Sequence, residues 1–190
     1  MIVALIPARG GSQRVPGKNK RMFFGKPIIV YSIETAKATG LFDQIIVTTD
    51  DREIADIAYG AGAWAVYRPK HLCDNEVGTQ EVISSHAGHM PSSMVCGIYA
   101  TSPLMLADDI RRAHRALVDH NNFHYAMAVG TEPLRDAGQF YFGRTEAFLK
   151  RKPLLTMHTA MIPIETKRVC DINTEEDWQR AESMYKELHP

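Results

Sequence analysis

The sequence has few cysteines, no long apolar run and no excess charge of either sign. Its three cysteines, Cys73, Cys96 and Cys170, are odd in number and lack metal-ligand spacing, which predicts reduced thiols. No apolar stretch approaches the ~18 residues that suggest a membrane span, and the N-terminus lacks the order of a signal peptide. Its 22 basic residues balance 22 acidic ones, which disfavours binding of nucleic acid or an anionic membrane by bulk charge. We therefore expect a cytoplasmic protein that binds neither nucleic acid nor membrane.

The two commonest phosphate-binding motifs are also absent. A Walker loop needs four residues between its glycines, whereas five separate Gly11 from Gly17, and Asn19 follows Lys18 where Ser or Thr is required. The dinucleotide fingerprint opens directly into a helix, but the next helical pattern here begins only at Pro27. An NAD-binding domain and a P-loop domain are therefore disfavoured.

What the sequence does contain is an apolar strand that leads into a basic, glycine-rich loop. Residues 2–6 predict a buried strand, and the loop follows directly. Gly10 and Gly11 let backbone N–H groups approach an anion closely. Arg9, Arg14 and Lys18 add positive charge around them. A glycine-rich loop alone can be merely a tight turn, but with these cations it predicts a phosphate site.

Strand and helix patterns alternate along the chain. Strands are predicted over residues 45–49, 63–67, 94–100 and 125–130, and helices over residues 27–40, 54–60, 79–86 and 110–117. This alternation is typical of βαβ units and predicts a three-layer α/β sandwich with a mostly parallel sheet, in a single domain over residues 1–190. Ligands of such sheets bind beyond the carboxyl ends of the strands. The basic loop, Asp50, Arg68 and Thr101 should therefore converge on one pocket.

Acidic residues follow two of the predicted strands. Asp50 and Asp51 precede a helix; we favour a helix cap for Asp51, while capping and metal binding are balanced for Asp50. Residues 169–172 predict a short strand, and Thr174 with Asp177 predicts the cap of a C-terminal helix, with Thr79 capping an earlier one. Asp171 should then lie where a strand meets a helix. The stretch after residue 130 has no regular pattern.

Short motifs along the whole chain resemble, in order, those of the acylneuraminate cytidylyltransferase family, which activates nonulosonic acids. They are residues 7–12 (PARGGS), 14–16 (RVP), 18–19 (KN), 24–27 (FGKP), 49–50 (TD), 67–69 (YRP), 100–104 (ATSPL) and 171–174 (DINT). Each motif is weak alone, but the ordered set is specific. Residues 96–102 (CGIYATS) and 136–141 (DAGQFY) further resemble the branch that makes CMP-pseudaminic acid.

The resemblance implies a nucleotide-diphospho-sugar transferase-like, Rossmann-like fold and a definite reaction. The anomeric hydroxyl of a nine-carbon acidic sugar attacks the α-phosphate of CTP and pyrophosphate leaves, with Mg²⁺ or another divalent cation as cofactor. Pseudaminic acid is the preferred sugar. The alternatives are N-acetylneuraminic, legionaminic or 3-deoxy-manno-octulosonic acid, and, in another class, a nucleotide-binding relative that has lost catalysis.

The same resemblance assigns roles to individual residues. Arg9, Lys18 and Asp171 are the implied catalytic residues. The implied nucleotide-binding residues are Ala8, Arg9, Gly10, Gly11, Ser12, Arg14, Lys18, Asn19, Arg68, Tyr99, Thr101 and Ser102. Asp136, Gln139 and Tyr141 are implied to face the sugar. Asp171 and Asn173 are the implied metal ligands.

Three features depart from the family pattern. Gln13 stands where most members have lysine, which removes one positive charge. Asn173 stands where the motif usually has a second aspartate, and a neutral oxygen offsets less metal charge, so metal affinity should fall. The few tens of residues that usually follow residue 130 and form a dimerisation arm are reduced to residues 131–135. We therefore expect a shortened or missing arm near residues 130–136, which leaves open whether the chain forms a homodimer.

Overall fold

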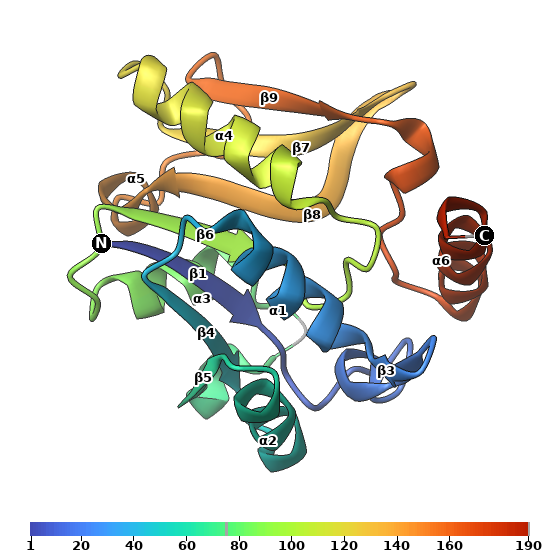
Figure 1. Ribbon diagram of the computed structural model, residues 1–190. Helices are drawn as coiled ribbons and strands as arrows, with labels where there is room; N and C mark the ends of the chain where they lie inside the picture. Colours follow the sequence, from blue (N-terminus) through green and yellow to red (C-terminus); the bar gives the residue numbers. More distant parts are fainter. Residues whose placement is uncertain (75, 190) are drawn as a thin grey trace.

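The chain folds around a seven-stranded sheet that is mostly parallel and has helices on both faces (Figure 1). The computed structural model describes residues 1–74 and 76–189. The strands are β1 (Ile2–Pro7), β4 (Gln44–Thr49), β5 (Trp64–Tyr67), β6 (Met94–Ile98), β7 (Tyr125–Thr131), β8 (Leu134–Arg144) and β9 (Thr159–Ile164). Their order is β5-β4-β1-β6-β8-β7-β9, and β8 runs antiparallel to both of its neighbours. A two-stranded ribbon, β2 (Met22–Phe23) with β3 (Lys26–Pro27), lies apart from this sheet.

The helices cover two faces because successive strand residues point in opposite directions. They are α1 (Ile28–Thr39), α2 (Arg52–Gly60), α3 (Thr79–Ala87), α4 (Ala107–Asp119), α5 (Thr145–Leu149) and α6 (Glu175–Leu188), with short 3-10 turns η1 (Lys18–Lys20), η2 (Lys70–Leu72) and η3 (Thr166–Arg168). In β1, Ala4 and Ile6 pack with α1, α2 and α4, whereas Val3 and Leu5 pack with α3 and α5. The predicted three-layer α/β sandwich is confirmed.

The helix α6 lies beyond the carboxyl ends of the parallel strands (Figure 1). Trp178 and Ala181 of α6 are buried against Phe23, Tyr31 and neighbouring apolar residues. The helix begins with a capping box, because the Thr174 side chain accepts from the Asp177 N–H and the Asp177 carboxylate accepts from the Thr174 N–H. This confirms the predicted cap and holds the residues before α6 at the sheet edge.

Two local predictions are wrong. Thr79 does not cap α3, because Gly78 occupies the N-cap position and Thr79 is the first helical residue. Residues 169–172 are irregular rather than a strand. The reason is that their backbone groups are used elsewhere: the Val169 N–H closes a turn on Thr166, and the Ile172 carbonyl accepts from Lys18.

The stretch after residue 130, which showed no pattern, forms a hairpin with a bulge. Thr131 pairs with Leu134, so the turn between β7 and β8 is tight. Farther along, the register jumps: Met127 faces Tyr141, but Val129 faces Asp136. The extra residues of β8 bulge out around Gly138, whose φ of 63° is left-handed. The bulge delivers residues 136–141 to the same sheet edge as α6.

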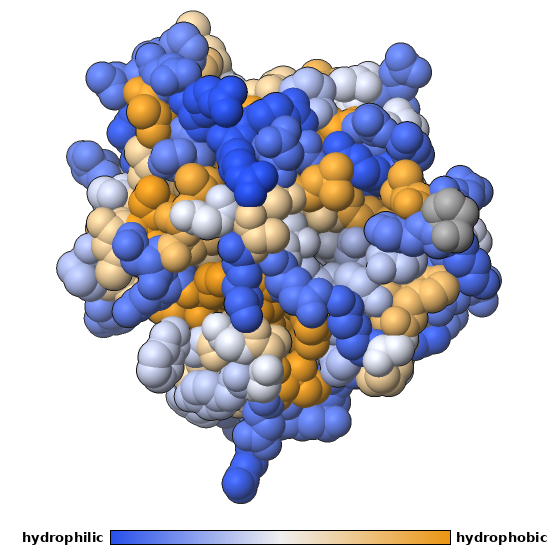
Figure 2. All heavy atoms as spheres, in the orientation of Figure 1, coloured by the Kyte–Doolittle hydropathy of each residue, from blue (hydrophilic) through white to orange (hydrophobic). Residues whose placement is uncertain are grey.

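Hydrophilic and hydrophobic residues are intermixed over the face drawn in Figure 2. Among the helices formed by residues 1–74 and 76–189, none combines the length and apolarity needed to span a bilayer.

Candidate active site

The loop after β1 is held in place by the amino end of α2. The Gly10 N–H donates to Asp50 Oδ1 at 2.8 Å. A Cβ atom at Gly10 would lie 2.7 Å from Asp51 Oδ2, so only glycine fits at this approach. Asp51 is the N-cap of α2, accepting from the Glu53 and Ile54 N–H groups, as predicted. Asp50 therefore positions the loop. In the sequence, the only feature that points to this role is its place directly after a strand.

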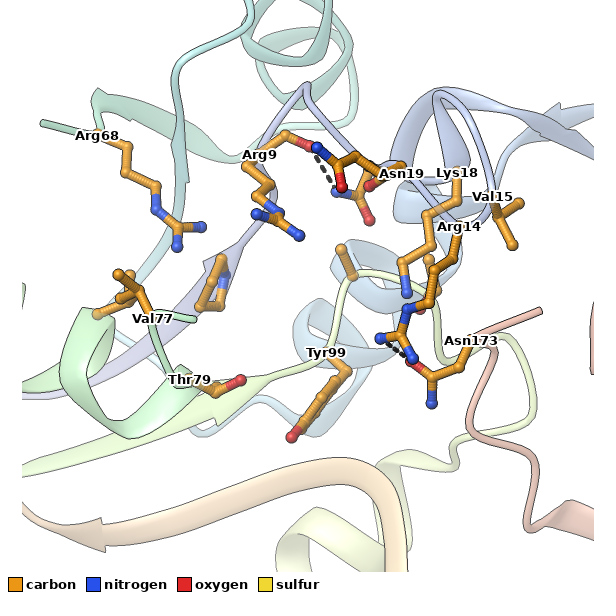
Figure 3. A pocket seen from close by; sticks show the side chains of 16 residues that line it. Arg9, Arg14, Val15, Lys18, Asn19, Arg68, Val77, Thr79, Tyr99 and Asn173 are labelled. Atoms are coloured by element: carbon orange, nitrogen blue, oxygen red, sulfur yellow. Dashed lines mark hydrogen bonds between the residues drawn. The ribbon is translucent and has the colours of Figure 1, made fainter. Parts of the chain in front are cut away.

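A pocket of about 450 Å³ opens at this sheet edge (Figure 3). Its lining consists of Pro7, Arg9, Ser12, Gln13, Arg14, Val15, Lys18, Asn19, Arg68, Val77, Thr79, Val82, Tyr99, Ala100, Thr101 and Asn173. Figure 3 shows Arg9 and Arg68 on one side of the space and Arg14 and Lys18 on the other. None of the lining residues that the structure describes is acidic. The predicted convergence of the loop with Arg68 and Thr101 is confirmed, whereas Asp50, predicted to join them, lies outside this lining. The result is a strongly cationic pocket.

Neutral oxygens hold the pocket cations. Lys18 Nζ donates to the Ile172 carbonyl at 2.7 Å, and Arg14 Nη2 donates to Asn173 Oδ1 at 2.9 Å. The buried Arg68 donates from Nε to the Leu72 carbonyl at 2.8 Å, and Arg9 Nη1 donates to the Cys73 carbonyl at 3.0 Å. A neutral oxygen orients a cation without cancelling its charge, so the pocket can attract a polyanion.

Burial and nearby charges act on the pKa of Lys18. Burial lowers the pKa of the ammonium group from the ordinary value of 10.5; Asp171 opposes this effect, and the positive charges of Arg14 and Arg9 add to it. Burial is likewise the main cause that lowers the pKa of Arg68. A triphosphate in the pocket would favour the charged form of Lys18, which ties anion binding to the protonation of this side chain.

Asn173 connects the loop to Asp171. Its Oδ1 accepts from Arg14, and its Nδ2 donates to Asp171 Oδ2 at 2.6 Å. Asp171 itself is exposed and packs against the β8 bulge, since a Cβ atom at Gly138 would lie 2.8 Å from the Asp171 Cβ. Both polar ends of the Asn173 amide are thus engaged, and Asn173 acts here as a bridge between a cation and a carboxylate.

The donor set fits a divalent cation that relies on few protein ligands. In residues 1–74 and 76–189, no group of three or more His, Cys, Asp or Glu side chains is placed to enclose a metal ion. Asp171 offers an exposed carboxylate next to the pocket, whereas the Asn173 oxygen already accepts one hydrogen bond from Arg14. Mg²⁺ commonly binds through one or two carboxylates together with substrate phosphates and water.

The predicted sugar-facing residues lie on and beside the bulge, outside the pocket lining. The Tyr141 hydroxyl donates to Asp136 Oδ2 and lies 3.1 Å from the hydroxyl of Tyr99, which does line the pocket. Gln139 is only 2% exposed, and its Nε2 donates to the Arg168 carbonyl at 2.7 Å. Asp136 and Tyr141 therefore connect to the pocket through Tyr99, and Gln139 points into the protein.

The predicted nucleotide-binding residues divide into two groups. Those that line the pocket are Arg9, Ser12, Arg14, Lys18, Asn19, Arg68, Tyr99 and Thr101. Those that lie outside the lining are Ala8, Gly10, Gly11 and Ser102. Ala8 is buried, and Ser102 Oγ donates to the Gly138 carbonyl at 3.2 Å, so these two support the walls. Val77, Thr79 and Val82 line the pocket without any signal in the sequence that marks them.

The chain has a nucleotide-diphospho-sugar transferase-like α/β fold, with a cationic pocket at one edge of its sheet. A solved CMP:2-keto-3-deoxy-manno-octonic acid synthetase complexed with CTP superposes with a TM-score of 0.81 at 15% identity, covering 98% of this chain and 99% of that one. Rv0371c from Mycobacterium tuberculosis, solved with manganese, superposes with a TM-score of 0.66 at 14% identity, covering 96% and 98% of the two chains. These likenesses concern the fold.

Sequence comparison gives the family. The cytidylyltransferase family profile matches residues 3–188. The pseudaminic acid cytidylyltransferase of Campylobacter jejuni is 31% identical over 225 residues, which cover 98% of this chain and 97% of that protein. A bifunctional Helicobacter pylori protein, named pseudaminic acid cytidylyltransferase and UDP-2,4-diacetamido-2,4,6-trideoxy-beta-L-altropyranose hydrolase, is 25% identical over 90% of this chain and 40% of its own length. The chain belongs to the cytidylyltransferase family and is a nucleotidyltransferase.

Proposed function

We propose that this protein transfers the CMP group of CTP to pseudaminic acid and releases pyrophosphate. The observation that carries the proposal is the convergence of Arg9, Arg14, Lys18 and Arg68 on one pocket, with Arg14 tied through Asn173 to the exposed carboxylate of Asp171. The similarity to the Campylobacter jejuni enzyme over nearly the whole of both chains supports this choice of sugar.

The reaction needs positioning and charge neutralisation rather than a covalent nucleophile. The anomeric oxygen forms a bond to the α-phosphorus, the bond from that phosphorus to the oxygen bridging the α- and β-phosphates breaks, and the hydroxyl proton passes to solvent water. Negative charge on the phosphoryl and leaving oxygens increases in the transition state, where fixed cations are most effective. We assign this task to Arg9, Arg14 and Lys18, and we assign Arg68, Thr101 and Asn19 to holding the nucleotide.

We infer that Asp171 holds a divalent cation, with Mg²⁺ as the physiological choice. Such a cation, when bound, supplies charge neutralisation at the phosphate oxygens. Asp171 is well placed because the Asn173 amide and the Gly138 bulge hold its side chain beside the pocket. Asn173 orients Asp171 and Arg14, and the second lone pair of its Oδ1 is the one it would offer to the cation.

We further propose that residues 1–190 form one catalytic domain, in the cytoplasm, where CTP is available. The alignment with the Campylobacter jejuni enzyme extends over 225 positions, more than the 190 residues here, so that relative has a segment without counterpart in this chain. The tight turn between β7 and β8 agrees with a shortened arm at residues 130–136. A homodimer would then need another surface. Light scattering of the purified chain would show whether a dimer forms.

Pyrophosphate release by the purified protein tests the proposal. CTP and Mg²⁺ should give turnover with pseudaminic acid and at least tenfold lower kcat/KM with N-acetylneuraminic, legionaminic or 3-deoxy-manno-octulosonic acid.

Asp171→Ala should abolish turnover and Mn²⁺ binding while the thermal unfolding midpoint is unchanged. Glu187→Ala, which removes an exposed charge of α6, is the matched control and should stay active.

Two results would contradict the proposal. Preferred turnover of another acid would reassign the sugar and keep the reaction. Binding of CTP without pyrophosphate release from any of these sugars would instead identify a nucleotide-binding relative without catalysis.

A further inference from the structure

Three side chains form a hydrogen-bonded chain that leads from the protein surface to the pocket. Asp136 is exposed, and its Oδ1 accepts from the Gly138 N–H at 2.8 Å. Its Oδ2 accepts from the Tyr141 hydroxyl, which lies 3.1 Å from the Tyr99 hydroxyl. Tyr99 is the member of this chain that lines the pocket.

The direction of every bond in this chain follows from the carboxylate at its end. An ionised carboxylate only accepts, so Tyr141 must give its single proton to Asp136. The contact between the two phenols then needs its proton from Tyr99, because Tyr141 has no second one to give. With its proton used, the Tyr99 oxygen can only accept from other groups, including Thr79, whose side chain interacts with the same hydroxyl.

Both phenols keep their protons near neutral pH. Burial is the main cause that raises the pKa of Tyr99; its hydrogen bonds with Tyr141 and Thr79 oppose this effect, and the carboxylates of Asp136 and Asp171 add to it. Burial also raises the pKa of Tyr141.

We propose that Asp136 makes Tyr99 a hydrogen-bond acceptor, and that Tyr99 thereby recognises a donor group of the sugar, either a hydroxyl or an acylamino N–H. The inference rests on the proposed function and names a specificity element for it. We assign Tyr99 to the sugar rather than to the nucleotide, for which the resemblance implies it. Asp136 and Tyr141, implied to face the sugar, are positioning residues that act through Tyr99. A sugar that offers an acceptor at this point leaves two unpaired acceptors facing each other, which is costly once the bound sugar has displaced the water between them.

Asp136→Asn tests this direction with almost no change of shape. The new Oδ1 can keep the bond from the Gly138 N–H, while the new amide N–H₂ donates to Tyr141. Tyr141 then donates to Tyr99, and Tyr99 points its proton into the pocket. We expect kcat/KM for the sugar to fall about 10- to 100-fold, mainly through the sugar KM, with the KM for CTP within about twofold of the wild type.

Tyr141→Phe is an independent second variant. It leaves the carboxylate in place but releases the Tyr99 proton, so it should reproduce the loss in sugar KM without changing the charge. Calorimetric binding of CTP and the thermal unfolding midpoint confirm that each variant is folded. A loss in CTP binding equal to the loss in sugar turnover would overturn the inference, because it would indicate general damage to the pocket.

The decisive experiment repeats Asp136→Asn in a Tyr99→Phe background. If Asp136 acts through Tyr99, the second substitution should change sugar kcat/KM by less than about twofold, because the chain no longer reaches the pocket. An equal loss in both backgrounds would show that Asp136 acts on the sugar or the cation directly and would overturn the inference alone. Absence of wild-type turnover with every sugar would overturn the proposed function and the inference together.

Discussion

Gly138 of β8 and Asp171 before α6 are in direct contact, although they are far apart in the sequence. A Cβ atom at position 138 would lie 2.8 Å from the Asp171 Cβ and 2.9 Å from its Cγ. Gly138 also has a φ of 63°, which L side chains rarely adopt. This one position therefore controls both the bulge that carries Asp136 and the carboxylate to which we assign the metal.

Gly138→Ala should destabilise the fold and displace Asp171. The left-handed φ costs about 1 to 2 kcal/mol, and the collision with Asp171 adds about 1 to 3 kcal/mol. Gly40→Ala is the control, because Gly40 has a φ of 66° and open space around its Cα. Urea unfolding should show a larger loss for Gly138→Ala, accompanied by weaker Mn²⁺ binding. Equal losses in unfolding free energy would mean that the contact with Asp171 relaxes freely.

Asn173→Asp should strengthen metal binding and destabilise the metal-free protein. The new carboxylate would lie beside that of Asp171, where the Asn173 amide now donates at 2.6 Å. Two adjacent carboxylates repel each other until a cation is bound, and a site with more ligand charge binds its cation more tightly, here by about tenfold. Mn²⁺ titration measures the affinity, and unfolding with and without Mg²⁺ measures the stability.

The matched control for this change is Asn173→Ala, which also removes the amide bridge but adds no charge. It should lower rather than raise the affinity for Mn²⁺, since Asp171 loses its orienting partner. If Asn173→Asp and Asn173→Ala changed the affinity in the same direction, the charge argument would fail.

Gln13→Lys should lower the KM for CTP. Gln13 lines the pocket near Arg14, so a lysine would add positive charge around the triphosphate. We expect an effect of about three- to tenfold at low ionic strength that shrinks at high salt. Gln13→Glu should have the opposite effect. An unchanged KM in both variants would show that Arg14 and its neighbours already supply all the charge that the nucleotide senses.

As the pH rises, the affinity for CTP should begin to fall at a lower pH than it would if Lys18 had the ordinary lysine pKa. Burial lowers the pKa of Lys18 below 10.5, and the triphosphate binds best to its charged form. As the pH rises through this lowered pKa, Lys18 loses its proton and the KM for CTP should increase. Lys18→Arg keeps the charge and should remove this alkaline dependence.

As the pH rises in the alkaline range, the unliganded protein should become more stable, whereas its affinity for CTP should fall. Between the lowered pKa of folded Lys18 and the ordinary value, the unfolded chain binds the proton and the folded chain does not. The unfolding free energy should therefore rise with pH as folded Lys18 becomes neutral. Urea unfolding of the wild type and of Lys18→Arg across alkaline pH would separate this contribution, and a falling wild-type curve relative to the variant would contradict it.

The elements that could be predicted are those whose signals lie close together in the chain. The buried strand before the basic loop, the helix that ends at Gly40, the cap at Asp51 and the capping box of Thr174 with Asp177 all appear in the structure. Helix caps and apolar periodicity depend on neighbours within a few residues, which the sequence shows directly. Arg9, Arg14 and Lys18 could be assigned to the pocket because they lie close together in the glycine-rich loop.

The sugar end of the site depends on contacts between distant parts of the chain. Strand β8 pairs with β6 and β7, and its bulge brings Gly138 against Asp171. Nothing local in residues 131–144 shows these pairings, so the sequence has no regular pattern there. Gln139, which the resemblance implies for the sugar, has a buried side chain.

By itself, then, the sequence determined the family, the α/β class and the cationic loop, since these follow from local patterns and ordered motifs. Only the tertiary structure decided that Asn173 bridges Arg14 and Asp171, and that Asp136 reaches the pocket through Tyr141 and Tyr99. Hydrogen-bond partners of this kind come from separate strands and loops, and only folding brings them within bonding distance.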